Sequence, residues 1–130
     1  MKKIETACII DDDEIYTYAV KKIIAITEIA SKTIFFANGQ MALDFFRDNL
    51  THAENLPDLV LLDINMPVLD GWQFMDEFCK LLISKKISIY IVSSSIDEAD
   101  FKRSCCYRQI TDFIVKPITA NKLREIALGI

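Results

Sequence analysis

Acidic side chains follow two apolar runs of this sequence. Asp11, Asp12 and Asp13 come directly after the run ACII, and Asp63 follows the run LVLL. Two carboxylates about 4 Å apart repel each other by roughly 4 kcal/mol at an effective dielectric constant of about 20, and a third increases that repulsion. A cation would offset it. Mg²⁺ prefers oxygen ligands of this kind, whereas no histidine or thiolate ends these runs to favour zinc or copper.

Helix capping explains part of the acidic cluster. One aspartate can cap the helix that follows, and Asp13 or Glu14 can lie in its first turn near the positive end of the helix dipole. Capping accounts for one or two of the acids and leaves the others unexplained. The excess of carboxylates still indicates a cation site.

Asp63 is a candidate nucleophile toward a phosphoryl group. A carboxylate at a strand end beside Mg²⁺ can form an aspartyl phosphate. Lys116, after the run DFIV, could neutralise charge on the phosphoryl oxygens, and Ser93, after IYIV, could donate a hydrogen bond to one of them. Considered singly, Lys116 is more simply a surface lysine and Ser93 a hydroxyl that bonds local backbone. Their joint occurrence at matched positions indicates a phosphoryl site.

Five apolar segments of strand length precede or contain these positions. We predict strands over residues 5–10, 32–36, 58–62, 87–92 and 111–115. Several are apolar almost throughout, as is typical of parallel strands that are covered on both faces. Alternation with helical stretches implies an α/β fold with a doubly wound parallel sheet. Ligands of such sheets bind beyond the carboxyl ends of the strands, where the candidate residues lie.

Amphipathic patterns predict helices between the strands. The apolar positions of the first three helices are Ile15, Tyr18, Ala19, Ile23 and Ile26, then Met41, Ala42, Phe45 and Phe46, then Trp72, Met75, Phe78, Cys79 and Leu82. A fourth helix is predicted over 97–107 and a fifth over 120–128. Asn38-Gly39, Asp70-Gly71 and Thr119 mark the starts of the second, third and fifth helices.

The size and composition of the chain bound its function. With 130 residues, 52% of them hydrophobic, we expect one domain over 1–130 and no output domain. A net charge of -4 argues against direct nucleic-acid binding, and no apolar run is long enough for membrane insertion. The four cysteines have no CxxC spacing, so we expect reduced, buried thiols in a soluble cytoplasmic protein rather than disulfides or a zinc site.

These motifs together resemble the receiver domain of two-component response regulators, of the stand-alone chemotaxis-regulator type. The resemblance runs from residues 11–13 through LVLLDINMPVLDGWQF and IYIVSSS to DFIVKPIT, and DxxMPxxDG followed by KP is a specific signature. It implies a flavodoxin-like fold with a five-stranded sheet in the order 2-1-3-4-5 and five helices. It also implies a histidine kinase or a histidine phosphotransfer protein as phosphoryl donor.

The resemblance assigns the metal and phosphoacceptor positions. Asp63 matches the phosphoacceptor, and Asp11 and Asp12 match the acidic pair of the family. Asp12 would bind Mg²⁺ directly and Asp11 largely through water. Asp63 and the backbone carbonyl of Asn65 would complete the metal shell.

The resemblance also assigns a switch. Ser93 and Lys116 would bind the phosphoryl group, and the Lys116–Pro117 bond would be cis. Ser93 and Phe113 would then change the surface formed by the fourth helix, fifth strand and fifth helix. Simple packing in the sheet is the alternative role for Phe113.

Two other functions are less consistent with the sequence. A Mg²⁺-dependent phosphatase or phosphotransferase of the haloacid-dehalogenase type would have a second Asp where this chain has Asn65, and a cap insertion for which there is no room. A receiver-like module that has lost phosphorylation would lack an acidic, hydroxyl or lysine position, and none is missing. We therefore expect a signalling phosphoacceptor with only self-phosphorylation and autodephosphorylation activity.

The sequence leaves several properties open. Asn65 and Ser95 occupy positions that tune dephosphorylation in the family, so the phosphoryl lifetime is not predicted. The usual glycine-containing turn before the fifth strand is replaced by CCYRQITDF, which leaves the shape of that loop open. The downstream target is also open, as is dimerisation of the phosphorylated form.

Overall fold

The apolar segments that alternate along the sequence form one parallel sheet. The computed structural model describes residues 4–94 and 97–129, and its strands run in the order β2-β1-β3-β4-β5. The strands are β1 (Ile4–Ile10), β2 (Ala30–Phe36), β3 (Leu59–Asp63), β4 (Ser88–Ser93) and β5 (Ile110–Val115). Each begins and ends within two residues of its predicted bounds. The predicted fold class and strand order are confirmed.

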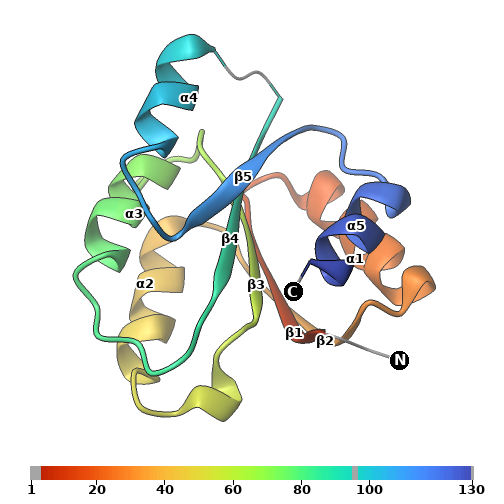
Figure 1. Ribbon diagram of the computed structural model, residues 1–130, viewed down its shortest axis with the longest axis horizontal. Coiled ribbons are helices and arrows are strands. Elements are labelled where there is room, and N and C mark those ends of the chain that lie inside the picture. Colours follow the sequence, from red (N-terminus) through yellow and green to blue (C-terminus); the bar gives the residue numbers. More distant parts are fainter. Residues whose placement is uncertain (1–3, 95–96, 130) are drawn as a thin grey trace.

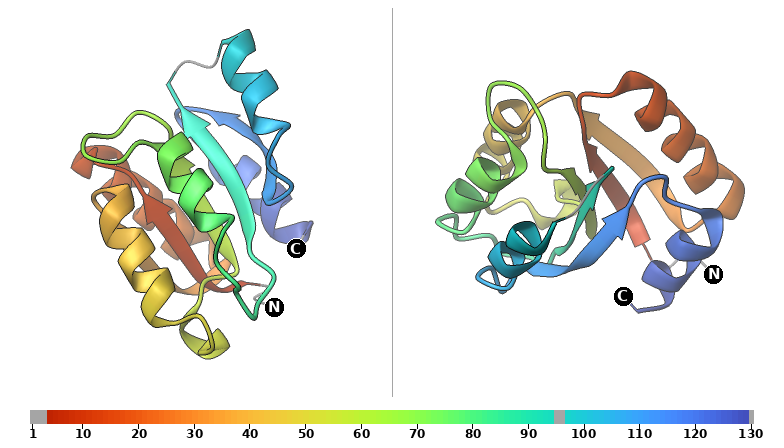
Figure 2. Two further views of the ribbon diagram at one scale, coloured as in Figure 1. Left: turned by 90° about the vertical axis from the view of Figure 1, so that its left-hand side faces the viewer. Right: turned by 90° about the horizontal axis from the view of Figure 1, so that it is seen from above.

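Helices cover both faces of the sheet. In Figures 1 and 2, α1 (Glu14–Thr27) and α5 (Ala120–Leu128) lie together on one face. The other face carries α2 (Gly39–Asp48), α3 (Gly71–Phe78) and α4 (Glu98–Ser104). A short 3₁₀ helix, η1 (Ala53–Asn55), precedes β3. Within the described residues, no helix combines the length and the apolar character needed to cross a membrane.

The central strands are apolar throughout because each of their faces enters a different core. Ala7 and Ile9 of β1 pack with α1 and α5, whereas Cys8 and Ile10 pack with α2 and α3. The same alternation continues along β3, and all of these side chains are almost completely buried. Because burial of a side chain such as Ile or Leu contributes about 1.5–3 kcal/mol, these two strands anchor the sheet and fix the ends where polar residues follow.

Side-chain caps set the helix starts. The residues that cap the five α-helices in chain order are Asp13, Asn38, Asp70, Asp97 and Thr119, and each accepts a hydrogen bond from the backbone N–H three residues later. At Asp70 a capping box is complete, because the Gln73 side chain also accepts from the Asp70 N–H. Caps of this kind contribute about 1 kcal/mol each. The predicted start signals of the second, third and fifth helices are therefore confirmed.

The predicted apolar face of α1 is wrong. The helix buries Thr17, Val20 and Ile24 against the sheet. Four of the five predicted positions are exposed, namely Ile15, Tyr18, Ala19 and Ile26. Apolar residues occur on both sides of this helix, so their spacing alone does not select the buried side. Met41 of α2 is exposed for the same reason, while the adjacent Ala42 and Leu43 are buried.

Other corrections concern helix ends and cysteines. Helix α3 ends at Phe78, so Leu82 lies beyond it and is 89% exposed. Helix α4 ends at Ser104 and is shorter than predicted. Only Cys8 is buried among the four free cysteines, and the other three lie at or beyond the carboxyl ends of α3 and α4, where they are exposed. Their helical context does not imply burial because these helix ends reach solvent.

Candidate functional site

The candidate residues meet at the carboxyl edge of the sheet. Asp11 follows β1, and Asp63 ends β3, where it pairs with Val92 of β4. Ser93 ends β4, and its backbone carbonyl accepts a hydrogen bond of 2.8 Å from the N–H of Lys116, directly after β5. Parallel strand register therefore brings together four positions that are widely separated in the sequence. Figure 1 shows the converging strand ends between α4 and the α1–α5 pair.

Three carboxylates form a potential cation site. Asp11, Asp12 and Asp63 each offer an oxygen, and these oxygens lie within 4.8 Å of one another. Asp11 and Asp63 are buried, whereas Asp12 is exposed at the rim. Asp11 Oδ2 is buried, and the Lys116 ammonium group 2.8 Å away balances its charge. This donor set of oxygens fits a hard divalent cation such as Mg²⁺.

Lys116 provides the cationic side chain of the site. Its Nζ lies 2.8 Å from Asp11 Oδ2 and 3.9 Å from Asp63 Oδ2, and only 17% of the side chain is exposed. The peptide bond between Lys116 and Pro117 is cis, as the resemblance implied. The ammonium group therefore pairs most closely with Asp11 and remains within reach of Asp63.

Electrostatics favour the protonated form of Asp63. Burial and the nearby Asp11 carboxylate raise the pKa of Asp63 to about 6, although Lys116 and the Asn65 N–H oppose the shift. That N–H lies 3.3 Å from Asp63 Oδ1. Because the carboxylate is the nucleophilic form, added positive charge beside Asp63 would increase the fraction ready to react.

Tyr16 is a site residue that the sequence reasoning missed. Its ring faces Lys116, whose Nζ is 4.2 Å from the ring centroid. Its hydroxyl is buried and has no hydrogen-bond partner in the described part of the chain. Burial and then the Asp11 carboxylate raise the pKa of the phenol, so Tyr16 stays neutral. An aromatic residue in the first helical turn after an acidic cluster was the available signal.

The loop after Asp63 is tightly folded. A Cβ on Gly71 would lie 2.7 Å from the Asp63 carbonyl oxygen and 2.8 Å from Ile64 Cα, so only glycine fits there. Val68 has a φ of 71°, and the Leu69 N–H donates across it to the Pro67 carbonyl at 2.8 Å. A left-handed conformation costs an L-residue about 1–2 kcal/mol, so this turn beside the acceptor carries local strain.

Ser93 and Phe113 are the two candidate switch residues. Ser93 is completely buried, and Phe113 is half-buried against the core that includes α3. The Phe113 ring stacks on Phe101 of α4, with 6.0 Å between centroids. Phe113 thus packs in the core, its alternative role, and also contacts α4. Ser95 lies outside the described residues.

The loop before β5 forms contacts with α3 that the sequence did not predict. Tyr107 stacks on Trp72 with a centroid separation of 5.9 Å, and its hydroxyl donates to Asp76. Arg103 lies 5.2 Å from the Trp72 ring and 3.7 Å from the Asp76 carboxylate. In place of a glycine-containing turn, the chain uses Tyr107 to attach the end of α4 to α3.

Comparisons with known proteins agree with this arrangement. The chain matches the family model of the response regulator receiver domain over residues 7–128. The structure of a two-component response regulator from Cytophaga hutchinsonii is 27% identical, with a TM-score of 0.86 and coverage of 100% of both chains. A response regulator receiver protein from Dyadobacter fermentans is 22% identical, with a TM-score of 0.79 and 94% of each chain covered, and shows the same fold.

A curated relative is longer than this chain. An uncharacterized response regulatory protein of Vibrio cholerae is 27% identical over 124 residues. The alignment covers 95% of this chain and 43% of that protein. The shared region is therefore less than half of the relative.

Proposed function

The chain belongs to the response regulator receiver domain family of two-component signalling, and from that premise we propose that Asp63 is its phosphoacceptor. The observation that carries this proposal is a buried carboxylate at the end of β3, with the Lys116 ammonium 3.9 Å away and two further carboxylates beside it. Receiver domains of this family bind Mg²⁺ at an acidic pocket. We propose Mg²⁺ as the cation here, held by Asp11, Asp12, Asp63 and the Asn65 backbone carbonyl.

Phosphoryl transfer would use the side chains as follows. An oxygen of the Asp63 carboxylate forms the new P–O bond, while the P–N bond of a phosphohistidine donor breaks and the imidazole leaves. Lys116 and the Ser93 hydroxyl bind the phosphoryl oxygens and stabilise their negative charge. A bound divalent cation would supply further charge stabilisation and favour ionised Asp63. Hydrolysis of the aspartyl phosphate returns the resting carboxylate.

The donor would be a histidine kinase or a histidine phosphotransfer protein. The family as a whole interacts with such proteins. All four cysteines are free thiols, which agrees with a reducing compartment, and we propose a cytoplasmic location. A receiver domain over residues 1–130 that makes no direct nucleic-acid contact is likewise our proposal.

The output would be a change of the α4–β5–α5 surface. Ser93 ends β4 at the phosphoryl site, and Phe113 of β5 contacts Phe101 of α4. Movement of Ser93 toward the phosphoryl group would open space for Phe113 to rotate inward and release that contact. The altered surface would select the downstream target or a second phosphorylated copy.

Labelling with a small phosphodonor tests the acceptor. Wild-type protein incubated with acetyl phosphate and Mg²⁺ should gain one phosphoryl group in intact-protein mass spectrometry, and Asp63→Asn should gain none. Asp48→Asn, at an exposed position of α2, is the matched control and should label like wild type. Stoichiometric labelling of Asp63→Asn would overturn the assignment. Continuous turnover of p-nitrophenyl phosphate, abolished by Asp63→Asn, would instead favour the phosphatase alternative.

The metal assignment needs its own measurement. Trp72 is the only tryptophan and follows the acceptor loop directly, so its fluorescence should report Mg²⁺ binding. Asp12→Ala should weaken Mg²⁺ binding in this titration because it removes one of the three carboxylates. Identical titration curves for wild type and Asp12→Ala would exclude Asp12 as a ligand.

A further inference from the structure

A cavity lies at the edge of the sheet opposite Asp63. Its volume is about 310 Å³, and it opens at the amino ends of β4 and β5, beyond the end of α3. Phe78, Leu81, Ile83 and Ile87 provide apolar lining, and Ser88 and Thr111 add hydroxyl groups. Cavities that bind small molecules typically begin near this size and combine apolar walls with a few polar groups.

The charged residues of this cavity all have the same sign. Lys85, Lys86 and Arg108 line it, and no carboxylate does, although the chain has a net charge of -4. Lys85 is neutralised by Asp58 at 2.9 Å. The side chains of Lys86 and Arg108 make no ion pair or hydrogen bond within residues 4–94 and 97–129, so their charge is available to a ligand.

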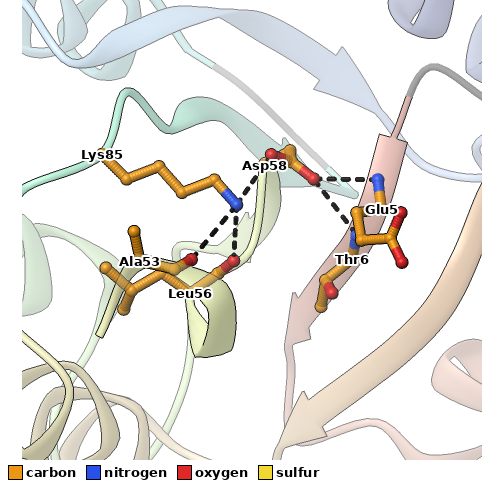
Figure 3. Close-up of polar contacts among 6 residues, drawn as sticks. All are labelled: Glu5, Thr6, Ala53, Leu56, Asp58 and Lys85. Carbon is orange, nitrogen blue, oxygen red and sulfur yellow. Dashed lines mark hydrogen bonds and ion pairs between the residues drawn. The ribbon is translucent and has the colours of Figure 1, made fainter.

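One wall of the cavity is held in place by hydrogen bonds (Figure 3). The Lys85 ammonium donates to the carbonyl of Leu56 at 2.9 Å and contacts that of Ala53 at 3.5 Å. Asp58 in turn accepts from the backbone N–H groups of Glu5 and Thr6, at 2.9 and 3.2 Å. The loop before β4 is thereby tied to the start of β1.

The opposite wall is also fixed. The Cys79 thiol, just after α3, donates to the Gln109 side-chain oxygen at 3.3 Å and connects α3 to the start of β5. Phe78 packs in the core and is only 5% exposed. A ligand would therefore meet a largely pre-formed cavity and would need to order little more than the exposed Lys86 and Arg108 side chains.

We propose that this cavity binds a small organic anion with an apolar body. The acidic group would lie between Lys86 and Arg108, and the apolar body would contact Phe78 and Ile87. A simple inorganic anion would leave the apolar lining unused, and a neutral apolar molecule would leave the two charges unpaired. This inference is independent of phosphorylation, because no residue of the Asp63 site lines the cavity.

Titration with 1-naphthalenesulfonate, followed in ¹⁵N–¹H NMR spectra, tests the proposal. The expected result is saturable shifts concentrated at the amides of Lys86, Ser88, Gln109 and Thr111. A neutral analogue, 1-naphthalenemethanol, and sulfate alone should each bind roughly tenfold more weakly or worse. Equal affinity of the neutral analogue would overturn the role of charge, and equal affinity of sulfate would overturn the role of the apolar lining.

Charge reversal at the cavity provides the second arm. The double variant Lys86→Glu and Arg108→Glu should weaken the binding of 1-naphthalenesulfonate by roughly tenfold or more. Lys32→Glu with Arg124→Glu has the same net charge at exposed positions away from the cavity and should bind like wild type. The double variant Lys86→Gln and Arg108→Gln removes the two positive charges without adding negative ones, and it should also weaken binding. Similar weakening of 1-naphthalenesulfonate binding by both charge-reversed pairs would contradict the proposed site. Chemical shift changes centred on residues 11–21, at the opposite edge of the sheet, would also contradict it.

Labelling by acetyl phosphate separates this site from the Asp63 site. All of the cavity variants should accept a phosphoryl group as wild type does, which also shows that they are folded. Loss of anion binding with normal labelling is the result expected if the two sites are independent. Failure of Asp63 labelling in wild type would refute the proposed function and leave the cavity result unaffected.

Discussion

Trp72 in α3 and Tyr107 beyond α4 stack with their ring planes only 14° apart. Trp72 follows Gly71, the residue that closes the acceptor loop, whereas Tyr107 leads into β5. Arg103 and Asp76 reinforce the stack through a cation–π contact and an ion pair. These contacts connect the segment next to Asp63 with the end of α4, which forms part of the proposed output surface.

Truncation of Tyr107 should loosen that connection. Tyr107→Ala removes an aromatic pair and the hydrogen bond to Asp76, so the free energy of unfolding should fall by about 1–2 kcal/mol. Trp72 emission should shift to longer wavelength as water reaches the ring. Tyr107→Phe keeps the stack and should lose less than half as much stability. Urea denaturation and fluorescence spectra of Tyr18→Ala, an exposed tyrosine on α1, provide the control.

Much of the fold was predictable because burial on both faces makes a parallel strand apolar throughout. Asp11 and Asp63 were found for a related reason, since each is the first charged residue after such a run. Asp11 and Asp63 are then close together because the adjacent parallel strands β1 and β3 end at the same edge of the sheet. Capping residues such as Asp70 were recognisable because the interaction spans only three residues.

The missed features depend on contacts between distant segments. Tyr16 meets Lys116 only because the ends of β1 and β5 lie at the same edge, and its sequence position indicates no partner. The stack of Trp72 and Tyr107 depends on the path of the loop after α4. The buried side of α1 was mispredicted because Ile15 and Ile26 match a helical period equally well on the solvent side.

Gly71 should be intolerant of any side chain. Gly71→Ala places a Cβ against the backbone of Asp63 and Ile64, which cannot move without displacing β3. We expect a loss of at least about 2 kcal/mol in the free energy of unfolding and slower labelling of Asp63. In Gly129→Ala the nearest atom is 3.6 Å away, an ordinary contact, so this control should be close to neutral. Equal stability of the two variants would mean that the acceptor loop is more adaptable than described.

The raised pKa of Asp63 should appear in the pH dependence of stability. The native state binds a proton more tightly than the unfolded state, whose Asp has a pKa near 3.8, so stability without divalent metal should fall as pH rises from about 4 to 6. Asp63→Asn removes this pH-dependent loss of stability because the Asn side chain does not ionise. The variant should therefore be more stable than wild type at pH 7 in EDTA, by on the order of 1–2 kcal/mol after allowance for solvent screening.

Urea denaturation from pH 4 to pH 7.5 checks this expectation. The advantage of Asp63→Asn should shrink toward pH 4, where the wild-type carboxyl is also neutral, and Mg²⁺ should stabilise wild type more than the variant. Asp48→Asn should follow wild type at every pH. A pH-independent advantage of Asp63→Asn would indicate a packing effect instead of an ionisation effect.

The Asp58–Lys85 pair should show the opposite pH dependence. Burial alone would raise the pKa of Asp58, but the hydrogen bond with Lys85 and the two backbone donors outweigh it and hold the pKa below 3.8. The carboxylate therefore contributes stability above about pH 4 and loses that contribution as pH falls through the native pKa. Asp58→Asn should destabilise the protein at pH 7 by about 1–3 kcal/mol, since it weakens charge-assisted hydrogen bonds.

The difference in the free energy of unfolding between wild type and Asp58→Asn should narrow below pH 4, which urea denaturation at pH 7 and pH 3 can measure.

Lys85→Met is the complementary variant. It retains much of the aliphatic chain, removes the ammonium group, and should raise the pKa of Asp58 toward its ordinary range. Because Lys85 also lines the cavity at this edge, Asp58→Asn should leave its charge unneutralised and strengthen 1-naphthalenesulfonate binding. The Asn side-chain oxygen can still accept from the N–H groups of Glu5 and Thr6, so unchanged stability of Asp58→Asn at pH 7 would show that the negative charge of Asp58 contributes nothing to holding this wall.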